Sequence, residues 1–238
     1  HRARPADGVD GLTRPRASLA RGVPGHRARC VAGEAGLADS DGGLRRGAAL
    51  RSVVPKGEQT ACEFRTAHEL TLWPVQVAGA RAFSFAADLP LGSLGLANRA
   101  RGGLRIRLGV ATGAPLADLA CDSLDFFVNA ADEIAGPLHE LACSQCIEVL
   151  VVGTESPPRV VARLGASAVS GQGFDESQAL LPYDRRSFQG YRLLREYFAF
   201  PQRFLFFRVE GLRQAFRSIT ASECELVLLF SRNEPGLE

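Results

Sequence analysis

Residues 180–212 read LLPYDRRSFQGYRLLREYFAFPQRFLFFRVEGL, and this stretch decides the predicted fold. Its first apolar side chains recur at helical spacing and form one stripe: Phe188, Tyr191, Leu194 and Phe198. A stripe with this period predicts an amphipathic helix, and we expect Ser187 to cap its start. Pro201 ends the helix, because a residue that precedes proline is pushed out of the helical region.

The segment after the proline, residues 204–209, is apolar on both sides and predicts a strand that is buried on both faces. Large aromatic side chains each bury roughly 150–250 Å² and dominate protein cores. We therefore expect these rings to form the densest part of the core. The carboxylates Glu196 and Asp184 are interpreted as solvated or paired groups, not as a catalytic acid and base.

Specific blocks of this stretch carry a family resemblance: LPY at 181–183, SFQGYRLL at 187–194, EYFAFP at 196–201 and FLFF at 204–207. Two further blocks lie upstream, CEFRT at 62–66 and ELTLWP at 69–74. Together they resemble the TssF family of type VI secretion baseplate proteins, also called VasA or ImpG, over about residues 50–232. We expect the motif residues to belong to the core: Phe64, Trp73, Pro74, Tyr183, Phe188, Gly190, Tyr191, Tyr197, Phe198, Phe200, Pro201, Phe204, Phe206 and Phe207.

The resemblance implies a structural component of the baseplate wedge that helps to initiate tail-tube and sheath assembly. The implied partners are TssG-, TssK- and TssE-like proteins and a second TssF copy. The implied location is the cytoplasm, docked at the inner-membrane secretion complex. The family brings no catalytic residue and no cofactor, so the resemblance implies a protein that is not an enzyme.

The composition is that of a globular protein, and we expect no nucleic acid among its partners. The formal charge of the 238 residues is only +2, which gives no general attraction to nucleic acid or acidic membranes. No run approaches the roughly 18 apolar residues of a membrane helix, so we expect no direct membrane insertion. The six cysteines are irregularly spaced, which favours reduced thiols over a disulfide framework.

The order of elements predicts a strand-rich α+β fold with sandwich-like antiparallel or mixed sheets and a few helices. Strands are predicted around residues 104–108, 123–128, 147–152, 160–169 and 224–230, and a helix is predicted to begin at Asp132. In residues 104–108 the apolar side chains alternate with two arginines, which predicts a half-buried strand. The predicted regions are a low-complexity segment at 1–49, a strand-rich region at 50–178 and a truncated helix–proline–strand region at 179–238.

Residues 1–49 lack aromatic side chains and are rich in Ala, Arg, Gly and Pro, so we expect them to be disordered or translated out of frame. An arginine-rich arm is the alternative. The chain contains no methionine, which suggests a fragment or a gene model begun in mid-frame. We expect the strand near 224–230 to form an exposed edge for lack of its natural neighbours.

Cys143 and Cys146 form the one conventional chemical motif, a Cys-x-x-Cys pair. A zinc site needs four ligands, and only His139 lies nearby in the sequence. A redox pair normally begins a helix, whereas this pair is predicted to lie where a helix ends. The weak alternatives to a scaffold are therefore a thiol- or zinc-dependent module at this pair, or a non-functional truncated product.

Overall fold

The computed structural model describes residues 12–13, 43–51, 63–180 and 188–237. These residues form two compact units, each made from separate parts of the chain. The first unit contains the described residues of 1–14, 74–171 and 205–238. The second unit contains the described residues of 15–73 and 172–204.

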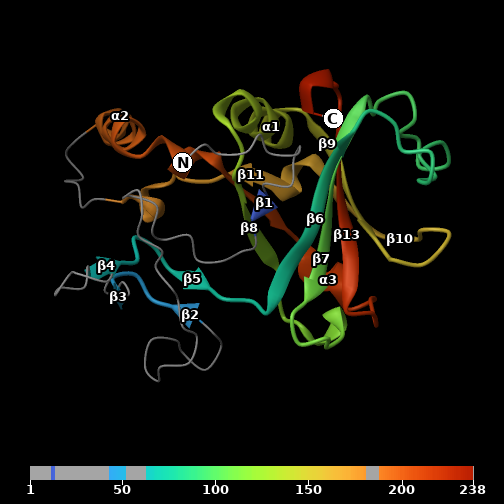
Figure 1. Ribbon diagram of the computed structural model, residues 1–238, viewed down its shortest axis with the longest axis horizontal. Coiled ribbons are helices and arrows are strands. Elements are labelled where there is room, and N and C mark those ends of the chain that lie inside the picture. Colours follow the sequence, from blue (N-terminus) through green and yellow to red (C-terminus); the bar gives the residue numbers. More distant parts are fainter. Residues whose placement is uncertain (1–11, 14–42, 52–62, 181–187, 238) are drawn as a thin grey trace, which may run out of the picture. The chain divides into compact units, whose positions relative to one another are not determined.

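A five-stranded antiparallel sheet dominates the first unit, with the order β10-β9-β13-β7-β6. Its strands are β6 (Val75–Phe83), β7 (Gly102–Val110), β9 (Cys146–Val152), β10 (Val160–Gly165) and β13 (Glu223–Phe230). Figure 1 shows β13 next to β7. The expectation of an exposed edge near residues 224–230 is wrong, because β13 pairs with β7 on one side and with β9 on the other.

The alternation in β7 follows the sequence pattern. Leu104, Ile106 and Leu108 are fully buried on one face, and Arg107 is exposed. Arg105 is less exposed than predicted, because its guanidinium lies 2.8 Å from an oxygen of Asp88 and 3.0 Å from one of Glu225. The hydrogen bond from Arg105 lowers the pKa of the Asp88 carboxyl. On the polar face of β7, Arg105 therefore forms ion pairs instead of being fully solvated.

Gly103 in β7 lies where no side chain fits. A Cβ at this position would stand 2.5 Å from the carbonyl oxygen of Leu228 and equally close to the ring of Phe83. We expect Gly103→Ala to destabilise the protein by about 1–3 kcal/mol, since backbone or ring must move. Gly136→Ala is the matched control, because its added Cβ meets nothing within 4 Å. It should instead stabilise its helix by about 0.5–1 kcal/mol. Urea unfolding measures the free energy of unfolding of both variants. If both substitutions changed it in the same direction, the close packing around Gly103 would be contradicted.

A four-stranded antiparallel sheet completes the strands of the first unit, in the order β1-β8-β12-β11. Its strands are β1 (Leu12–Thr13), β8 (Ser123–Val128), β11 (Val169–Gly171) and β12 (Phe206–Glu210). Phe207 of β12 is completely buried and stacks on Phe126 of β8, with ring centroids 5.3 Å apart. The predicted strand at 204–209 therefore begins two residues later, because Pro201–Leu205 forms a 3-10 helix.

Burial in β12 alternates, so the prediction that both faces are buried is wrong. Phe207 and Val209 are buried, whereas Phe206 and Arg208 on the opposite face are partly exposed. Arg208 Nε donates to Asp125 Oδ1 at 2.6 Å, which satisfies the charge on that face. One side of this strand therefore carries the core packing.

Helix α1 (Asp132–Ser144) begins at the predicted residue and contacts strands of both sheets, namely β8, β11 and β12 of one and β9 and β13 of the other. It buries Ala135, Leu138, Leu141 and Ala142. The short helix α3 (Leu212–Phe216) precedes β13 and buries Phe216 completely. The packing of α1 accounts for the apolar spacing seen in its sequence.

The described residues of the second unit include two short strand pairs and the α-helix α2. β2 (Gly43–Leu44) pairs with β5 (Leu70–Thr71), and β3 (Ala49–Arg51) pairs with β4 (Glu63–Arg65). Helix α2 (Gln189–Ala199) confirms the predicted helix and ends just before Pro201. The predicted cap Ser187 lies outside the described residues.

The strand-rich α+β class is confirmed, and every described strand pairing is antiparallel. The expectation for 1–49 falls mostly on residues outside the described part of the chain. Among the helices that are described, none has the length and apolar character needed to cross a membrane.

Candidate functional site

The Cys143–Cys146 pair lies at the junction between α1 and β9, as the sequence predicts. Cys143 Sγ lies 3.4 Å from His139 Nε2, and this nitrogen lies 3.1 Å from the carbonyl oxygen of Phe206. A carbonyl oxygen can only accept, so His139 Nε2 carries the proton of that hydrogen bond. Within the described ranges, no group of three or more His, Cys, Asp or Glu side chains is placed to hold a metal ion.

Burial changes the pKa values of the two thiols and of the His139 imidazole in the direction that makes them less reactive. It raises the pKa of the Cys143 thiol to about 11 and that of the Cys146 thiol to about 12. Burial also lowers the pKa of His139, which keeps the imidazole neutral. A nucleophilic or redox thiol needs the opposite shift, toward the thiolate. The environment of the pair therefore favours packing over chemistry.

Alkylation should report this environment directly. At pH 8 the thiolate fraction of Cys143 is about a hundredth of that of an ordinary thiol, since its pKa rises from 9.0 to about 11. We expect iodoacetamide to modify Cys143 at least about 50-fold more slowly in the folded protein than in urea. Peptide mass spectrometry provides the rates, and the folded rate should rise with pH up to about 11. Equal rates in the folded protein and in urea at pH 8 would support the thiol module instead.

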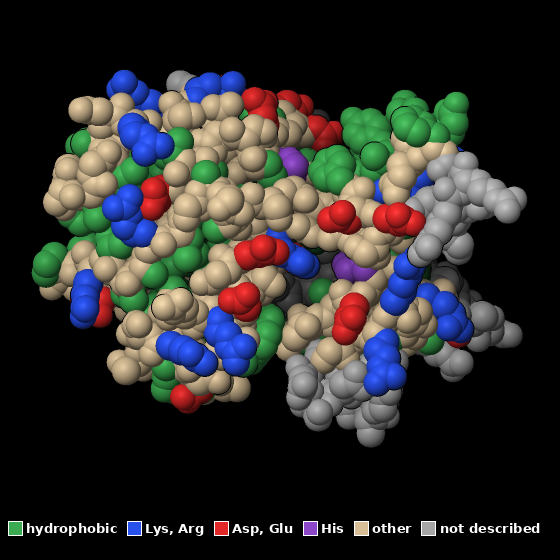
Figure 2. Space-filling model, turned by 180° about the vertical axis from the view of Figure 1, so that it is seen from behind, with side chains coloured by type: hydrophobic (Ala, Val, Ile, Leu, Met, Phe, Trp, Pro, Cys, Tyr) green, Lys and Arg blue, Asp and Glu red, His purple; other side chains and the backbone are tan. Residues whose placement is uncertain are grey.

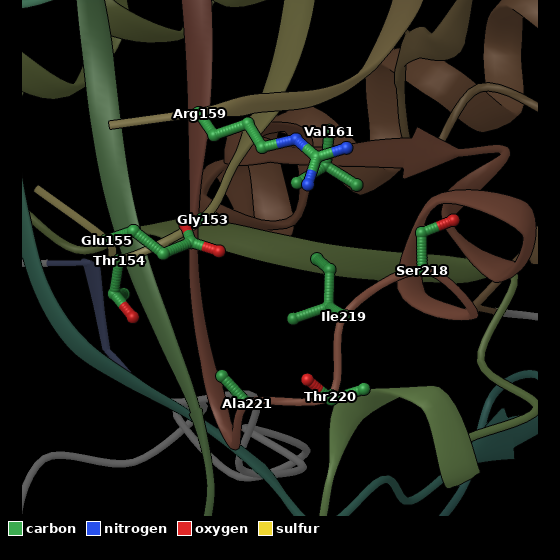
Figure 3. A pocket seen from close by; sticks show the side chains of 9 residues that line it. All are labelled: Gly153, Thr154, Glu155, Arg159, Val161, Ser218, Ile219, Thr220 and Ala221. Atoms are coloured by element: carbon green, nitrogen blue, oxygen red, sulfur yellow. The ribbon is translucent and has the colours of Figure 1, made fainter. Parts of the chain in front are cut away.

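A surface pocket of about 240 Å³ lies in the first unit (Figure 3). It is lined by the connection between β9 and β10, by the start of β10 and by the segment before β13: Gly153, Thr154, Glu155, Arg159, Val161, Ser218, Ile219, Thr220 and Ala221. Every side chain in it that carries a hydroxyl or a charge is exposed to solvent. A binding site normally holds a few convergent polar groups within an apolar lining, and this pocket has no such arrangement.

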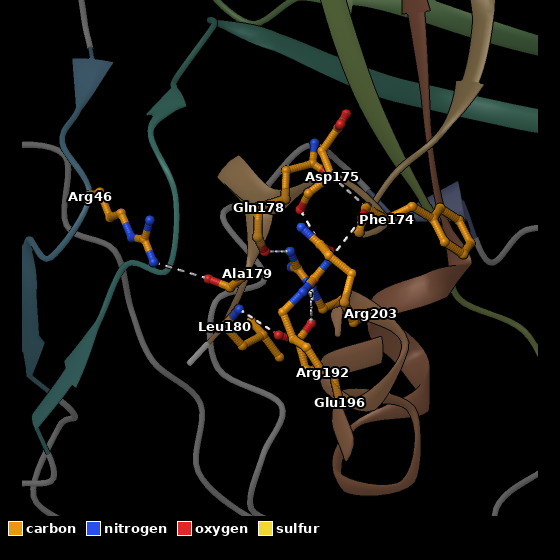
Figure 4. Close-up of polar contacts among 11 residues, drawn as sticks. Arg46, Phe174, Asp175, Gln178, Ala179, Leu180, Arg192, Glu196 and Arg203 are labelled. Carbon is orange, nitrogen blue, oxygen red and sulfur yellow. Dashed lines mark hydrogen bonds and ion pairs between the residues drawn. The ribbon is translucent and has the colours of Figure 1, made fainter. Parts of the chain in front are cut away.

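The second unit contains a buried charge network centred on Glu196 of α2 (Figure 4). The side chain of Glu196 is only 2% exposed. Its Oε2 lies 3.1 Å from Arg192 Nη1 and 3.6 Å from Arg203 Nε, and its Oε1 accepts the backbone N–H of Leu180 at 3.0 Å. The interpretation of Glu196 as a paired carboxylate is confirmed. Asp184 lies outside the described residues.

The same arginines attach residues 174–180 to the helix. Arg192 Nη2 donates to the carbonyl oxygen of Phe174 at 2.8 Å, and Arg203 Nη2 donates to that of Gln178. Burial lowers the pKa of Arg203, while the negative charge of Glu196 opposes that shift. Figure 4 shows these side chains converging on one segment of backbone. Sequence analysis missed the network, although the i, i+4 spacing of Arg192 and Glu196 was its visible signal.

The motif residues do not form one buried cluster. Phe207 is buried, and the partly exposed ones are Phe64, Trp73, Gly190, Phe200, Phe204 and Phe206. The exposed ones are Pro74, Phe188, Tyr191, Tyr197, Phe198 and Pro201, and Tyr183 lies outside the described residues. The expectation of an interior motif is therefore wrong for α2. The aromatic side chains of α2 are exposed because the opposite side of the helix, with Arg192 and Glu196, is the buried one.

Exposed apolar surface that is rich in aromatic side chains is typical of surfaces that bind other molecules, and aromatic residues are enriched at protein interfaces. The family model described as "Type VI secretion system, TssF" matches residues 30–238, and the chain belongs to this family. The resemblance found in the sequence is thus confirmed. The family match begins at residue 30, whereas the sequence blocks placed the start of the resemblance at about residue 50.

A curated relative, the type VI secretion system component TssF1 of Pseudomonas aeruginosa, is 43% identical over 204 residues. That similarity covers 85% of this chain and 32% of TssF1. A solved structure of a TssK-TssF-TssG baseplate subcomplex contains a chain with a similar fold, at a TM-score of 0.62 and 23% identity. The match covers 81% of this chain and 34% of that one, so this chain spans about a third of the length of these relatives.

Proposed function

We propose that the chain is a structural component of the type VI secretion baseplate wedge. The observation that carries this proposal is the family match over residues 30–238, together with 43% identity to TssF1. The similar fold in a TssK-TssF-TssG baseplate subcomplex supports it. In this role the chain presents folded surfaces to its neighbours, and no reaction takes place on it.

The proposed partners are TssG-, TssK- and TssE-like proteins and a second TssF copy. The proposed place of action is the cytoplasm, at the inner-membrane secretion complex, where the assembled wedge helps to start tail-tube and sheath growth. TssG and TssK are named in the subcomplex that contains the similar fold, which supports these two partners most directly.

Co-expression tests this function. The tagged 238-residue chain is expressed with the TssG-family and TssK-family proteins of the same source, and complexes are analysed by size-exclusion chromatography with light scattering. We expect at least one partner to elute with the chain in a complex of defined mass. The two partners without the chain provide the background control. A folded, soluble chain that binds neither partner would contradict the proposal.

A further inference from the structure

Helix α2 exposes its large apolar side chains. On the helix, Tyr191, Leu194, Tyr197 and Phe198 are 53–81% exposed, and Phe188 at its start is 71% exposed. Figure 2 shows a group of hydrophobic side chains over the region of this helix. We call these five residues the α2 aromatic face. The burial of an apolar face, which normally stabilises a helix in a protein, therefore contributes little to α2.

The buried side of α2 is bound to the main chain of residues 174–180, which we call the strap (Figure 4). The two buried residues of the helix are both charged, Arg192 and Glu196. Arg192 Nη2 donates to the carbonyl oxygen of Phe174 at 2.8 Å, and the backbone N–H of Leu180 donates to Glu196 Oε1 at 3.0 Å. The helix therefore holds the strap near both of its ends through hydrogen bonds to the backbone.

The 3-10 helix that follows α2 adds further contacts between the strap and the helix. The ring of Phe204 lies 5.3 Å from that of Phe174 in the strap and 6.0 Å from that of Tyr197 in α2, measured between centroids. The neighbouring Arg203 donates to the carbonyl oxygen of Gln178 in the strap. Rings and charges thus connect the same two segments.

The strap begins after a residue that has to be glycine. Gly173 has a φ of +100°, a backbone conformation that side chains disfavour. A Cβ at this position would stand 3.3 Å from the ring of Phe204 and 3.4 Å from the side chain of Arg203. A side chain at position 173 would therefore strain the start of the strap, although none of these neighbours belongs to α2.

We infer that the strap and α2 form a conformational latch, in which the two segments open and close together while the sheets of the first unit stay folded. In the closed state the charges of Arg192 and Glu196 are buried and α2 is helical. In the open state the strap leaves and the helix loses its order. Because the side chains of residues 174–177 are exposed, the latch links a solvent-accessible segment to the order of α2. This property belongs to the chain itself and is independent of the proposed function.

The length and the contacts of α2 explain why it opens together with the strap. The helix has 11 residues, and isolated helices shorter than about 12–15 residues are marginal in water. Without the strap, Arg192 and Arg203 lose backbone acceptors and Glu196 loses a donor. Hydrogen bonds to charged groups are among the strongest in proteins. Since no apolar side chain of α2 is buried, little remains to hold the helix once these bonds are broken.

Native-state hydrogen exchange of the full 238-residue chain, followed by NMR at low urea concentrations, tests the latch. The amide of Leu180 reports on the strap, the amides of residues 193–199 report on α2, and those of β13 serve as the reference. We expect the strap and helix amides to share one opening equilibrium constant within about threefold. The amides of β13 should be protected at least about 100-fold more strongly, because they exchange only when the first unit opens.

Two substitutions disturb the latch from its two sides. Glu196→Gln removes the charge on the helix side, and Gly173→Ala strains the strap side. We expect each variant to speed the exchange of strap and helix amides by the same factor, at least about tenfold for Glu196→Gln and about fivefold for Gly173→Ala. Gly43→Ala is the matched control in the same unit, because its added Cβ meets nothing within 4 Å. Its exchange rates should stay within about twofold of the wild type.

Each outcome decides the question. Equal acceleration of the strap and helix amides by both variants, with β13 and the Gly43→Ala control unchanged, supports the latch. Acceleration of Leu180 alone by Gly173→Ala overturns it, because the helix is then held without the strap. Equal acceleration of β13 shows global unfolding and also overturns it, as does exchange that neither variant alters. If a variant fails to fold, the wild-type urea series decides, since different opening constants for strap and helix contradict the latch and a shared constant supports it.

Discussion

Replacing Glu196 with alanine should lower the free energy of unfolding of the second unit by about 3–5 kcal/mol, because the substitution removes the buried carboxylate that Arg192 and Arg203 both contact. The side chains of Arg192 and Arg203 are 4% and 8% exposed, so water cannot replace the lost carboxylate. The backbone N–H of Leu180 also loses its acceptor. Trp73 is the single tryptophan of the chain and belongs to the second unit. Its fluorescence in urea therefore follows the relevant transition.

Two variants serve as controls for this experiment. Arg195→Ala changes an exposed residue of the same helix and should alter stability by less than about 0.5 kcal/mol. Glu196→Gln keeps an acceptor for the backbone N–H of Leu180 but removes the charge. Its loss of stability should therefore be smaller than that of Glu196→Ala and larger than that of Arg195→Ala. If Glu196→Ala were as stable as Arg195→Ala, the buried network would not hold the segment 174–180, and the orientation of α2 would need another cause.

Phe207→Ala should destabilise the first unit by about 3–5 kcal/mol, because it empties a fully buried site in the four-stranded sheet. The substitution also removes the stacking on Phe126. Far-UV circular dichroism during urea unfolding measures the loss, since most strands belong to this unit.

Phe85→Ala is the control for that substitution, because it removes the same side chain from an 80% exposed position. Its effect should stay within about 0.5 kcal/mol. Equal losses for the two variants would show that Phe207 is not the packing residue described here. Phe207→Leu should lose less than Phe207→Ala, since most of the site stays filled.

Local sequence patterns predicted the elements of this fold well. The alternation in residues 104–108 marks β7, and the spacing after Asp132 marks α1, because both patterns reflect one buried face. The position of β13 at the centre of its sheet could not be predicted in this way. Strand order depends on pairings between distant residues, and both pairings of β13 join it to segments far earlier in the chain.

The α2 aromatic face shows where periodicity is insufficient. The spacing of Tyr191, Leu194 and Phe198 establishes that they share a side of the helix, but it does not say whether that side is inward. The answer depends on Arg203 and on the backbone of residues 174–180, which approach the opposite side only in the folded unit. A charged pair four residues apart was visible in the sequence, whereas its burial was not.

The central position of β13 has a consequence for synthesis on the ribosome. β6 and β7 form one hairpin-like pair and β9 and β10 form another, and only β13 joins the two pairs. Until residues 223–230 have left the exit tunnel, both pairs present an unsatisfied strand edge to the cell. Unpaired strand edges favour aggregation, so we expect the nascent chain to be most prone to aggregate before β13 has been made.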